Sequence, residues 1–99
     1  MIGWLTRRWE RRLQMARVSI AQALLVEPSK RWFGWDLSRE AGVSSGIVYP
    51  VLQRMLKEGL LVHGWETAEE AGRRPPRRWV QPSERGRDEL WSCIVPEWS

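Results

Sequence analysis

Residues 36–60 read DLSREAGVSSGIVYPVLQRMLKEGL, and this stretch decides how the chain folds. Its first part predicts a helix, because Leu37 and Ala41 are four residues apart and share one helix face. Gly42 then ends that helix, since glycine readily adopts the left-handed conformation common just beyond a helix C-terminus. Ser44 is a favoured N-cap for a second helix. The stretch therefore predicts two helices joined by a tight turn.

The second helix, residues 45–58, divides into an apolar face and a polar face. At about 100° per residue, a set of apolar side chains falls on one arc. This set consists of Val48, Val51, Leu52, Met55 and Leu56. The opposite face begins at Ser45, is flanked by Tyr49 and Arg54, and carries Gly46, Pro50, Gln53 and Lys57. Hydrogen-bonding and cationic groups opposite a packed face suit a helix in the major groove of DNA. We therefore predict a DNA-binding helix-turn-helix, with an ordinary pair of surface helices as the alternative.

The composition favours an anionic partner. The chain has 99 residues, enough for one modest core, a formal net charge of +4 and a pI of about 10.2. Such a balance favours nucleic acid before membrane. The sequence has no apolar run long enough to span a bilayer and no signal-peptide pattern, so we expect a cytoplasmic protein without membrane contact.

The residues that could carry out catalysis are few. Cys93 is the only cysteine and His63 the only histidine, so neither an internal disulfide nor a cluster of metal ligands is expected. A predicted strand and loop separate the two residues, and no third catalytic partner is suggested. We therefore expect no enzyme, no metal and no cofactor.

Residues 3–26 predict a long N-terminal helix, because apolar side chains recur at three- and four-residue steps. The stripe consists of Leu5, Trp9, Leu13, Ala16, Ile20 and Leu24. The other faces carry Arg7, Arg8, Arg11, Arg12 and Arg17. These arginines could contact phosphates or an anionic membrane surface, and a solvated face is the alternative. We expect one helix or a break near residues 17–19, where Ser19 offers a cap, and then a connector at residues 29–34.

The region after the helix-turn-helix predicts a wing. Residues 60–66 alternate well enough for a strand, and residues 77–81 predict a second strand that pairs with the first. The intervening residues 67–76, TAEEAGRRPP, predict a loop because glycine and proline disfavour regular structure there. The tip and base of this wing carry Arg73, Arg74, Arg77 and Arg78. With no acid between them, these arginines could straddle a phosphate backbone or enter a minor groove, and a solvated turn is the alternative.

The two ends of the chain predict a contact surface between subunits. Ser83 caps a last helix over residues 84–94, whose apolar stripe is Leu90, Trp91 and Ile94. A chain of this length has too little core to cover the apolar residues of both terminal helices. We therefore predict a homodimer built from Trp4, Leu5, Trp9, Trp91, Ile94 and Trp98. The alternative is that Trp4 and Trp9 fold back onto their own winged core.

Two segments, GIVYPVLQRMLKEGLLVHGWE at residues 46–66 and GRRPPRRWVQPSERGRDEL at residues 72–90, carry a resemblance to a known family. Together with FGWDL at residues 33–37, they resemble the PadR family of winged-helix transcriptional regulators. The shared features are a Tyr-Pro pair in the recognition helix, a Gly-Leu step into the first strand, and an Arg-Arg-aromatic second strand before a Ser-Glu helix start. The resemblance covers residues 18–92. It departs from the family at Phe33, where histidine is usual, and at Pro82, where an aliphatic residue is usual.

The resemblance implies a dimeric repressor that binds inverted repeats. In the family, the terminal helices build the dimer, and some members release DNA when they bind a phenolic or drug-like molecule. By position, Tyr49 and its neighbours would face DNA, and the wing arginines would hold phosphate. A small aromatic effector is therefore a further expected partner.

The sequence as a whole predicts a mainly α (α+β) winged helix-turn-helix with a two-stranded wing between flanking N- and C-terminal helices. We expect one domain over residues 1–99, with helices in 1–26, the helix-turn-helix in 33–59, the wing in 60–81 and a last helix in 83–95. The predicted function is sequence-specific binding of duplex DNA to regulate transcription, as a repressor. The predicted DNA-binding residues are Ser44, Ser45, Gly46, Tyr49, Pro50, Gln53, Arg54, Lys57, Arg73, Arg74, Arg77 and Arg78. The alternatives are an architectural factor of the excision type and a tryptophan-rich protein-interaction module.

Overall fold

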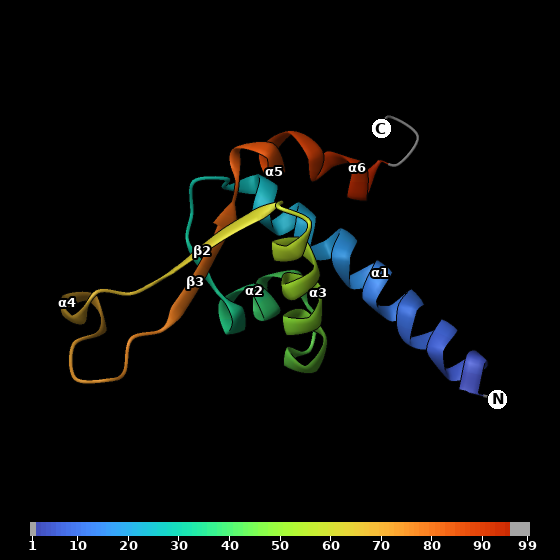
Figure 1. The fold of residues 1–99 in the computed structure, drawn as a ribbon, viewed down its shortest axis with the longest axis horizontal. Helices are drawn as coiled ribbons and strands as arrows, with labels where there is room; N and C mark the ends of the chain where they lie inside the picture. The colour runs from blue at the N-terminus through green and yellow to red at the C-terminus, as the bar shows by residue number, and fades with distance from the viewer. Residues whose placement is uncertain (1, 96–99) are drawn as a thin grey trace.

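The chain is mainly helical, with a small antiparallel sheet (Figure 1). The computed structural model describes residues 2–95, so Trp98 lies outside the described residues. In chain order the elements are α1 (Ile2–Val26), β1 (Trp32–Phe33), α2 (Gly34–Ala41), α3 (Ser45–Lys57), β2 (Leu61–Trp65), α4 (Ala68–Ala71), β3 (Arg78–Pro82), α5 (Glu84–Glu89) and α6 (Trp91–Ile94). The predicted class, a winged helix-turn-helix between terminal helices, is confirmed.

The sheet has three strands in the order β1-β3-β2, and both neighbours of β3 run antiparallel to it. The strands β2 and β3 form the predicted wing ribbon. The strand β1 was not predicted, because residues 29–34 were expected to form a connector. Only Trp32 and Phe33 belong to it, opposite Val80 and Trp79. Two residues are too short to show a strand periodicity in the sequence.

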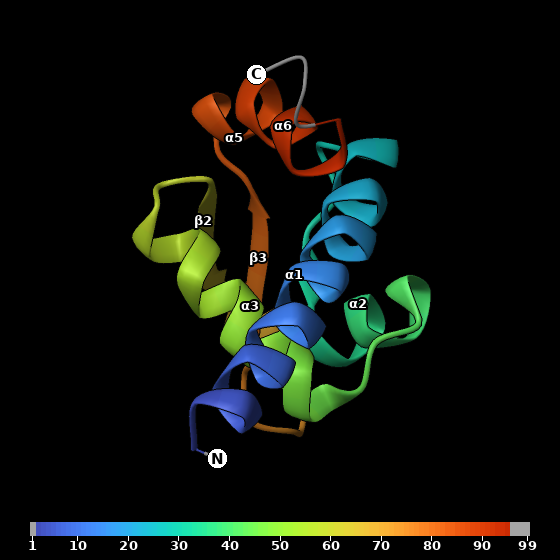
Figure 2. The same ribbon diagram turned by 90° about the vertical axis from the view of Figure 1, so that its right-hand side faces the viewer.

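The core lies where α1, α2 and α3 meet the sheet (Figure 2). On α3 the predicted apolar face is confirmed: Val48, Val51, Leu52 and Met55 are buried, and Leu56 is partly buried. The other large, fully buried side chains are Ile20 and Leu24 of α1, Leu37 of α2 and Leu90. Periodic apolar positions on separate helices thus converge on one core.

Helix α1 runs without interruption, so the break considered near residues 17–19 does not occur. Its buried stripe continues through that region with Ala16, Ile20 and Leu24, and packing against α2 and α3 holds the whole segment helical. From residue 3 onward, the first buried residue of the helix is Leu13. The part before Leu13 projects away from the core (Figure 1).

The C-terminal segment forms α5 and α6 rather than one helix. Leu90, between them, keeps near-helical backbone angles, with φ −61° and ψ −24°, so the interruption is slight. Ser83 caps α5 as predicted, because its hydroxyl accepts a hydrogen bond from the Gly86 N–H at 2.9 Å. The predicted apolar stripe is wrong at Trp91, which is exposed to solvent. The buried residues of this segment include Leu90 and Cys93.

Gly86 shows how closely α5 approaches the end of the helix-turn-helix. A Cβ atom at this position would lie 1.9 Å from the carbonyl oxygen of Leu60. That oxygen accepts a hydrogen bond from the Ser83 N–H at 3.0 Å, and the Ser83 hydroxyl donates to the Gly59 carbonyl at 2.7 Å. The approach therefore fixes the last helices against the start of the wing.

The segment between the wing strands contains a short helix where an irregular loop was predicted. Thr67 and Glu70 form a reciprocal capping box around α4: the Glu70 N–H donates to the Thr67 hydroxyl at 3.1 Å, and the Thr67 N–H donates to the Glu70 carboxylate at 2.8 Å. This pairing satisfies two donors at the start of the helix. The irregular segment is therefore shorter than predicted and begins at Gly72.

Candidate nucleic-acid interface

Backbone hydrogen bonds hold the turn between α2 and α3. Gly42 adopts the predicted left-handed conformation, with φ 67°, and its N–H donates to the Arg39 carbonyl. The Val43 N–H donates to the Ser38 carbonyl at 2.9 Å, and the Ser38 hydroxyl donates to the Val43 carbonyl. The turn is therefore tied to α2 at both of its first residues.

Ser44 occupies the N-cap position of α3 but does not cap it with its side chain. Its backbone is extended, with φ −65° and ψ 151°, and its hydroxyl makes no capping hydrogen bond. Its carbonyl instead accepts hydrogen bonds from the N–H groups of Ile47 and Val48, at 3.0 Å each. The position was predicted correctly and the hydroxyl's role was not, so this hydroxyl remains exposed beside the start of α3.

The face of α3 opposite the core is exposed along its length. The exposed residues are Ser45, Gly46, Tyr49, Gln53, Arg54 and Lys57. Pro50 is half-buried and lies inside the helix, which continues past it to Lys57. The structure thus brings the predicted polar residues together on one accessible surface.

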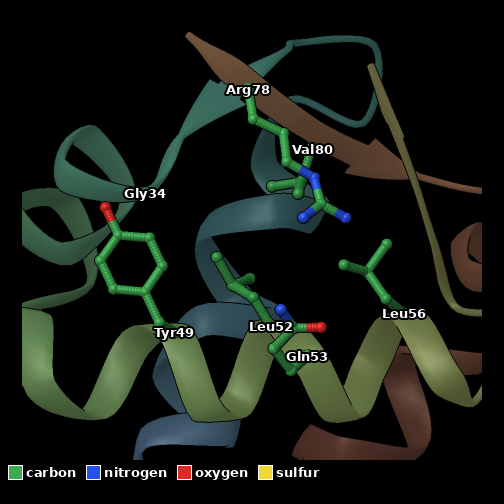
Figure 3. Close-up of a pocket in the computed structure, with 7 residues that line it drawn as sticks. All are labelled: Gly34, Tyr49, Leu52, Gln53, Leu56, Arg78 and Val80. Atoms are coloured by element: carbon green, nitrogen blue, oxygen red, sulfur yellow. The ribbon is translucent and has the colours of Figure 1, made fainter. Parts of the chain in front are cut away.

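The position of the Tyr49 side chain depends on Gly34, a residue that was not among the predicted site residues. A Cβ atom at Gly34 would lie 2.5 Å from the Tyr49 ring, so only glycine leaves room for this side chain along the start of α2 (Figure 3). Gly34 is therefore a positioning residue for Tyr49.

A small groove separates α3 from the strand β3. Tyr49 and Gln53 of α3 line one side, and Arg78 of β3 extends over the helix from the other (Figure 3). Its cavity volume is about 70 Å³. A cavity that holds benzene has about 150 Å³. The groove therefore suits side chains and water better than the predicted aromatic effector, which stays a prediction.

Arg54 forms an ion pair with Glu10 of α1. Its two terminal nitrogens donate to the two carboxylate oxygens of Glu10, each at 2.9 Å. The hydrogen bonds from Arg54 lower the pKa of Glu10, and the same contact raises the pKa of Arg54. A second ion pair, between Arg17 and Glu58 at 2.7 Å, also joins α1 to the end of α3. Arg54, predicted to contact DNA, therefore has a carboxylate partner in this structure.

The wing arginines are not four free cations, because Glu66 holds two of them. Arg74 donates to its carboxylate at 2.5 and 2.9 Å, and the Arg77 backbone N–H and side-chain Nε donate at 2.9 and 3.3 Å. The Glu66 side chain is only 7% exposed. The hydrogen bond from Arg74 is the main cause that lowers the pKa of Glu66 to about 2. The sequence indicated only that no acidic residue lies between the four arginines. Glu66 precedes the loop, so this observation did not reveal it as the partner of two of them.

Arg73 and Arg78 are the wing arginines without a carboxylate partner in residues 2–95. The Arg78 Nε donates to His63 Nδ1 at 3.1 Å, across the two wing strands. The Arg77 guanidinium also stacks over the Phe33 ring, 4.0 Å from its centroid. In the wing, Arg74 and Arg77 are therefore paired with a carboxylate, and Arg73 and Arg78 are exposed without one in the described chain.

Four of the residues predicted for the subunit contact are exposed to solvent to between about two fifths and three fifths of their surface. Trp4 is 51% exposed, Leu5 58%, Trp9 39% and Trp91 56%. Ile94 is partly buried against the protein's own core. Trp4 and Trp9 therefore do not fold back onto the winged core, which was the alternative considered.

Over residues 2–95 no helix has both the length and the apolar character needed to cross a membrane. The same part of the chain contains no group of three histidine, cysteine or acidic residues placed to hold a metal ion.

Comparison with known proteins agrees with this architecture. A crystal structure of a PadR-like transcriptional regulator from Bacillus cereus has a TM-score of 0.63 at 24% identity, with 82% of this chain and 81% of that chain covered. A PadR family regulator from Eggerthella lenta has a TM-score of 0.61 at 18% identity, over 99% and 88% of the two chains. A MarR family regulator from Silicibacter pomeroyi has a TM-score of 0.62 at 14% identity, over 98% and 68%. At these identities the likeness shows the fold alone.

Sequence comparison identifies the family. No curated protein matches the chain. The family model described as "Transcriptional regulator PadR-like family" matches residues 36–92, which include the helix-turn-helix, the wing and α5. The chain therefore belongs to the PadR-like family of DNA-binding transcriptional regulators.

Proposed function

We propose that this protein is a sequence-specific repressor that binds duplex DNA as a homodimer, with α3 in the major groove. The observation that carries the proposal is the division of α3. Its inner face is buried against α1, and its outer face presents Ser45, Tyr49, Gln53 and Lys57 to solvent. Donors and acceptors on a firmly packed helix are what recognition of base edges needs. A repressor would act by occupying the operator.

Gln53 is the proposed base-reading residue. It lies midway along the exposed face of α3, at the mouth of the groove below Arg78 (Figure 3). A glutamine side chain can donate to and accept from adenine at once, and such a pair gives about 1–3 kcal/mol of discrimination. Tyr49, held by Gly34 at the start of α2, would contact DNA beside it.

The wing would supply phosphate contacts that do not depend on sequence. Arg73 and Arg78 are free of carboxylates in the described chain, so they are the wing arginines proposed to hold phosphate. Arg74 and Arg77 keep the wing in shape through Glu66 and contact DNA only if that pairing yields. Each phosphate neutralised steepens the dependence of log affinity on log salt by about 0.9.

The proposed dimer follows from the apolar surface left on α1. Leu5 and Trp9 continue the buried stripe of Leu13 outward along the helix, beyond any core residue of the same chain. A second copy that covers this stripe would bring two α3 helices to successive major grooves, about 34 Å apart. Trp91, at the other end of the chain, is exposed and available to the same contact.

Sedimentation equilibrium tests the dimer. The wild-type chain should be a dimer at micromolar concentration, and the double variant Leu5→Ala/Trp9→Ala should be a monomer. Met15→Ala is a matched control, because Met15 is 73% exposed on another face of the same helix. A monomeric wild-type chain, or equal weakening by Met15→Ala, would reject the dimer.

The rival function is a protein-interaction module, favoured by the exposed rings of Trp35 and Trp65. Salt dependence separates the two. Binding of a mixed-sequence duplex should weaken steeply between about 50 and 200 mM salt, because counterions return to the phosphates. A contact lined by tryptophan should be nearly insensitive to salt. If duplex DNA does not bind at about 50 mM salt, the proposed function fails. An architectural role would instead show as strong bending of the bound duplex.

A further inference from the structure

We infer that Arg8 and Arg12 of α1 form a second phosphate-binding site, which binds the DNA backbone on the side of α3 opposite the wing. This inference rests on the proposed DNA binding and adds a site to it. The position of the projecting helix and the lack of carboxylate partners for its arginines carry it.

The outer part of α1 is a basic segment without internal neutralisation. Four exposed arginines lie before Leu13, at positions 7, 8, 11 and 12. Glu10 is the only acidic residue of α1, and it is held by Arg54. None of the four arginines has a carboxylate partner within residues 2–95. Their charge therefore remains available to an anionic ligand.

The arginines belong to two sides of the helix. Arg8 and Arg12 are four residues apart and share one side, about 6 Å from each other along the axis. Arg12 lines an open groove together with Ser44 and Ile47, so this side faces the start of α3. Arg8 lies one turn further out, with its guanidinium 5.5 Å from the centroid of the Trp4 ring. Arg7 and Arg11 lie about 100° away around the helix.

The arrangement of the elements places this side toward DNA. In Figure 1 the wing lies on one side of α3 and the projecting half of α1 on the other. The beginning of α3, the tip of the wing and the N-terminal end of α1 all point downward, and they do so again in Figure 2. A duplex that receives the start of α3 would therefore meet the wing on one flank and α1 on the other.

A membrane surface would also attract arginines, but the placement favours DNA. A membrane-binding helix needs its apolar face free to enter the lipid. Here the exposed part of the apolar stripe, at Leu5 and Trp9, is the surface that the proposed second subunit would cover, and Arg12 lines the same groove as Ser44 at the start of α3. Duplex DNA bound at the start of α3 therefore explains the placement of Arg12, and a membrane surface does not.

The test compares two double variants with the same change in charge. Arg8→Gln/Arg12→Gln removes the proposed site, and Arg7→Gln/Arg11→Gln removes two arginines from the other side of the same exposed segment. Glutamine retains a high helix propensity, so both variants should keep α1 helical. Circular dichroism and sedimentation equilibrium check that folding and oligomeric state are unchanged. The affinity for a mixed-sequence duplex is then measured between about 50 and 200 mM salt.

We expect Arg8→Gln/Arg12→Gln to make the slope of log affinity against log salt shallower by about two units per protomer. The control pair should leave the slope near that of the wild-type chain. Equal effects of the two pairs, or no change in either, would overturn the inference while DNA binding itself stands. If the wild-type chain does not bind the duplex, both the proposed function and this site fail. Loss of binding to anionic vesicles by Arg8→Gln/Arg12→Gln, with an unchanged DNA slope, would assign the arginines to a membrane instead.

Discussion

The two halves of α1 share one helix and one sequence periodicity, yet they lie in opposite environments. From Leu13 onward, the apolar stripe is buried against α2, α3 and the sheet. Before Leu13, the same stripe continues through Trp9 and Leu5, which are 39% and 58% exposed to solvent. The inner half serves the fold, and the outer half offers an apolar stripe and an arginine face that the fold does not use.

The wing, on the other side of α3, differs from the outer half of α1 in how its arginines are paired. It also projects and is also rich in arginine, but Glu66 binds two of its guanidinium groups. The outer half of α1 has no such carboxylate, because Glu10 belongs to Arg54. Each region has four arginines in the sequence, but two of the four in the wing are paired with Glu66, whereas none of the four in the outer half of α1 has a carboxylate partner within residues 2–95.

The largest expected effect is a difference in the free energy of unfolding between substitutions in the inner and outer halves of α1. Ile20→Ala should lower the free energy of unfolding by about 2–5 kcal/mol, because Ile20 is fully buried and alanine leaves a cavity. Leu5→Ala should change it within about 0.5 kcal/mol at a protein concentration low enough for the monomer. Urea unfolding followed by circular dichroism measures both. A large loss for Leu5→Ala in the monomer would show that the outer half belongs to the core after all.

A smaller effect is expected at the junction between α1 and α3. Glu10→Gln removes the carboxylate that holds Arg54, so Arg54 becomes free to reach a phosphate. The salt dependence of duplex binding should steepen by about one unit. Glu69→Gln is the matched control, since it makes the same change of charge at an exposed residue of the wing. Equal slopes for the two variants would mean that Arg54 stays away from DNA even when released.

The smallest effect concerns the wing and its dependence on pH. The pKa of Glu66 lies at about 2 in the folded chain, below its ordinary value of 4.5, mainly because Arg74 donates to the carboxylate. A lowered pKa means that the ionised form stabilises the wing. This contribution is complete above pH 4.5 and is lost as the pH falls toward about 2.

An NMR titration of the Glu66 carboxyl group checks the sign and size of this shift. Arg74→Gln should return the pKa of Glu66 toward 4.5, and Arg73→Gln should leave it low, because Arg73 does not contact the carboxylate. A wild-type value near 4.5 would show that the wing arginines are as free as those of α1.

Much of the fold was predictable from the sequence, because α1 and α3 are long enough for their periodicity to show. The apolar face of α3, from Val48 to Met55, is buried as predicted. The strand β1 and the helix α4 were missed since each is short. The Thr67 and Glu70 capping box was visible in the sequence, but the glycine and prolines that follow it outweighed it.

The contacts that decide which arginines are free were not predictable. Arg54 and Glu10 are 44 residues apart, and their pairing depends on how α1 crosses α3. Arg74 and Arg77 meet Glu66 only because the wing strands fold back in one register. Gly34 matters only once Tyr49 has packed over it. Such contacts arise from tertiary structure and leave no local pattern in the sequence.

Selection of bound sequences from random duplex DNA tests most directly whether α3 reads bases. The wild-type chain should enrich an inverted repeat whose half-sites are about 34 Å apart. Gln53→Ala should keep this repeat and lose the preference at one position in each half-site. Lys57→Ala, a change on the same exposed face, should keep the full preference and weaken binding to all sequences alike. An enriched repeat that Gln53→Ala leaves unchanged, or no enriched sequence at all for the wild-type chain, would contradict the placement of α3 in the major groove.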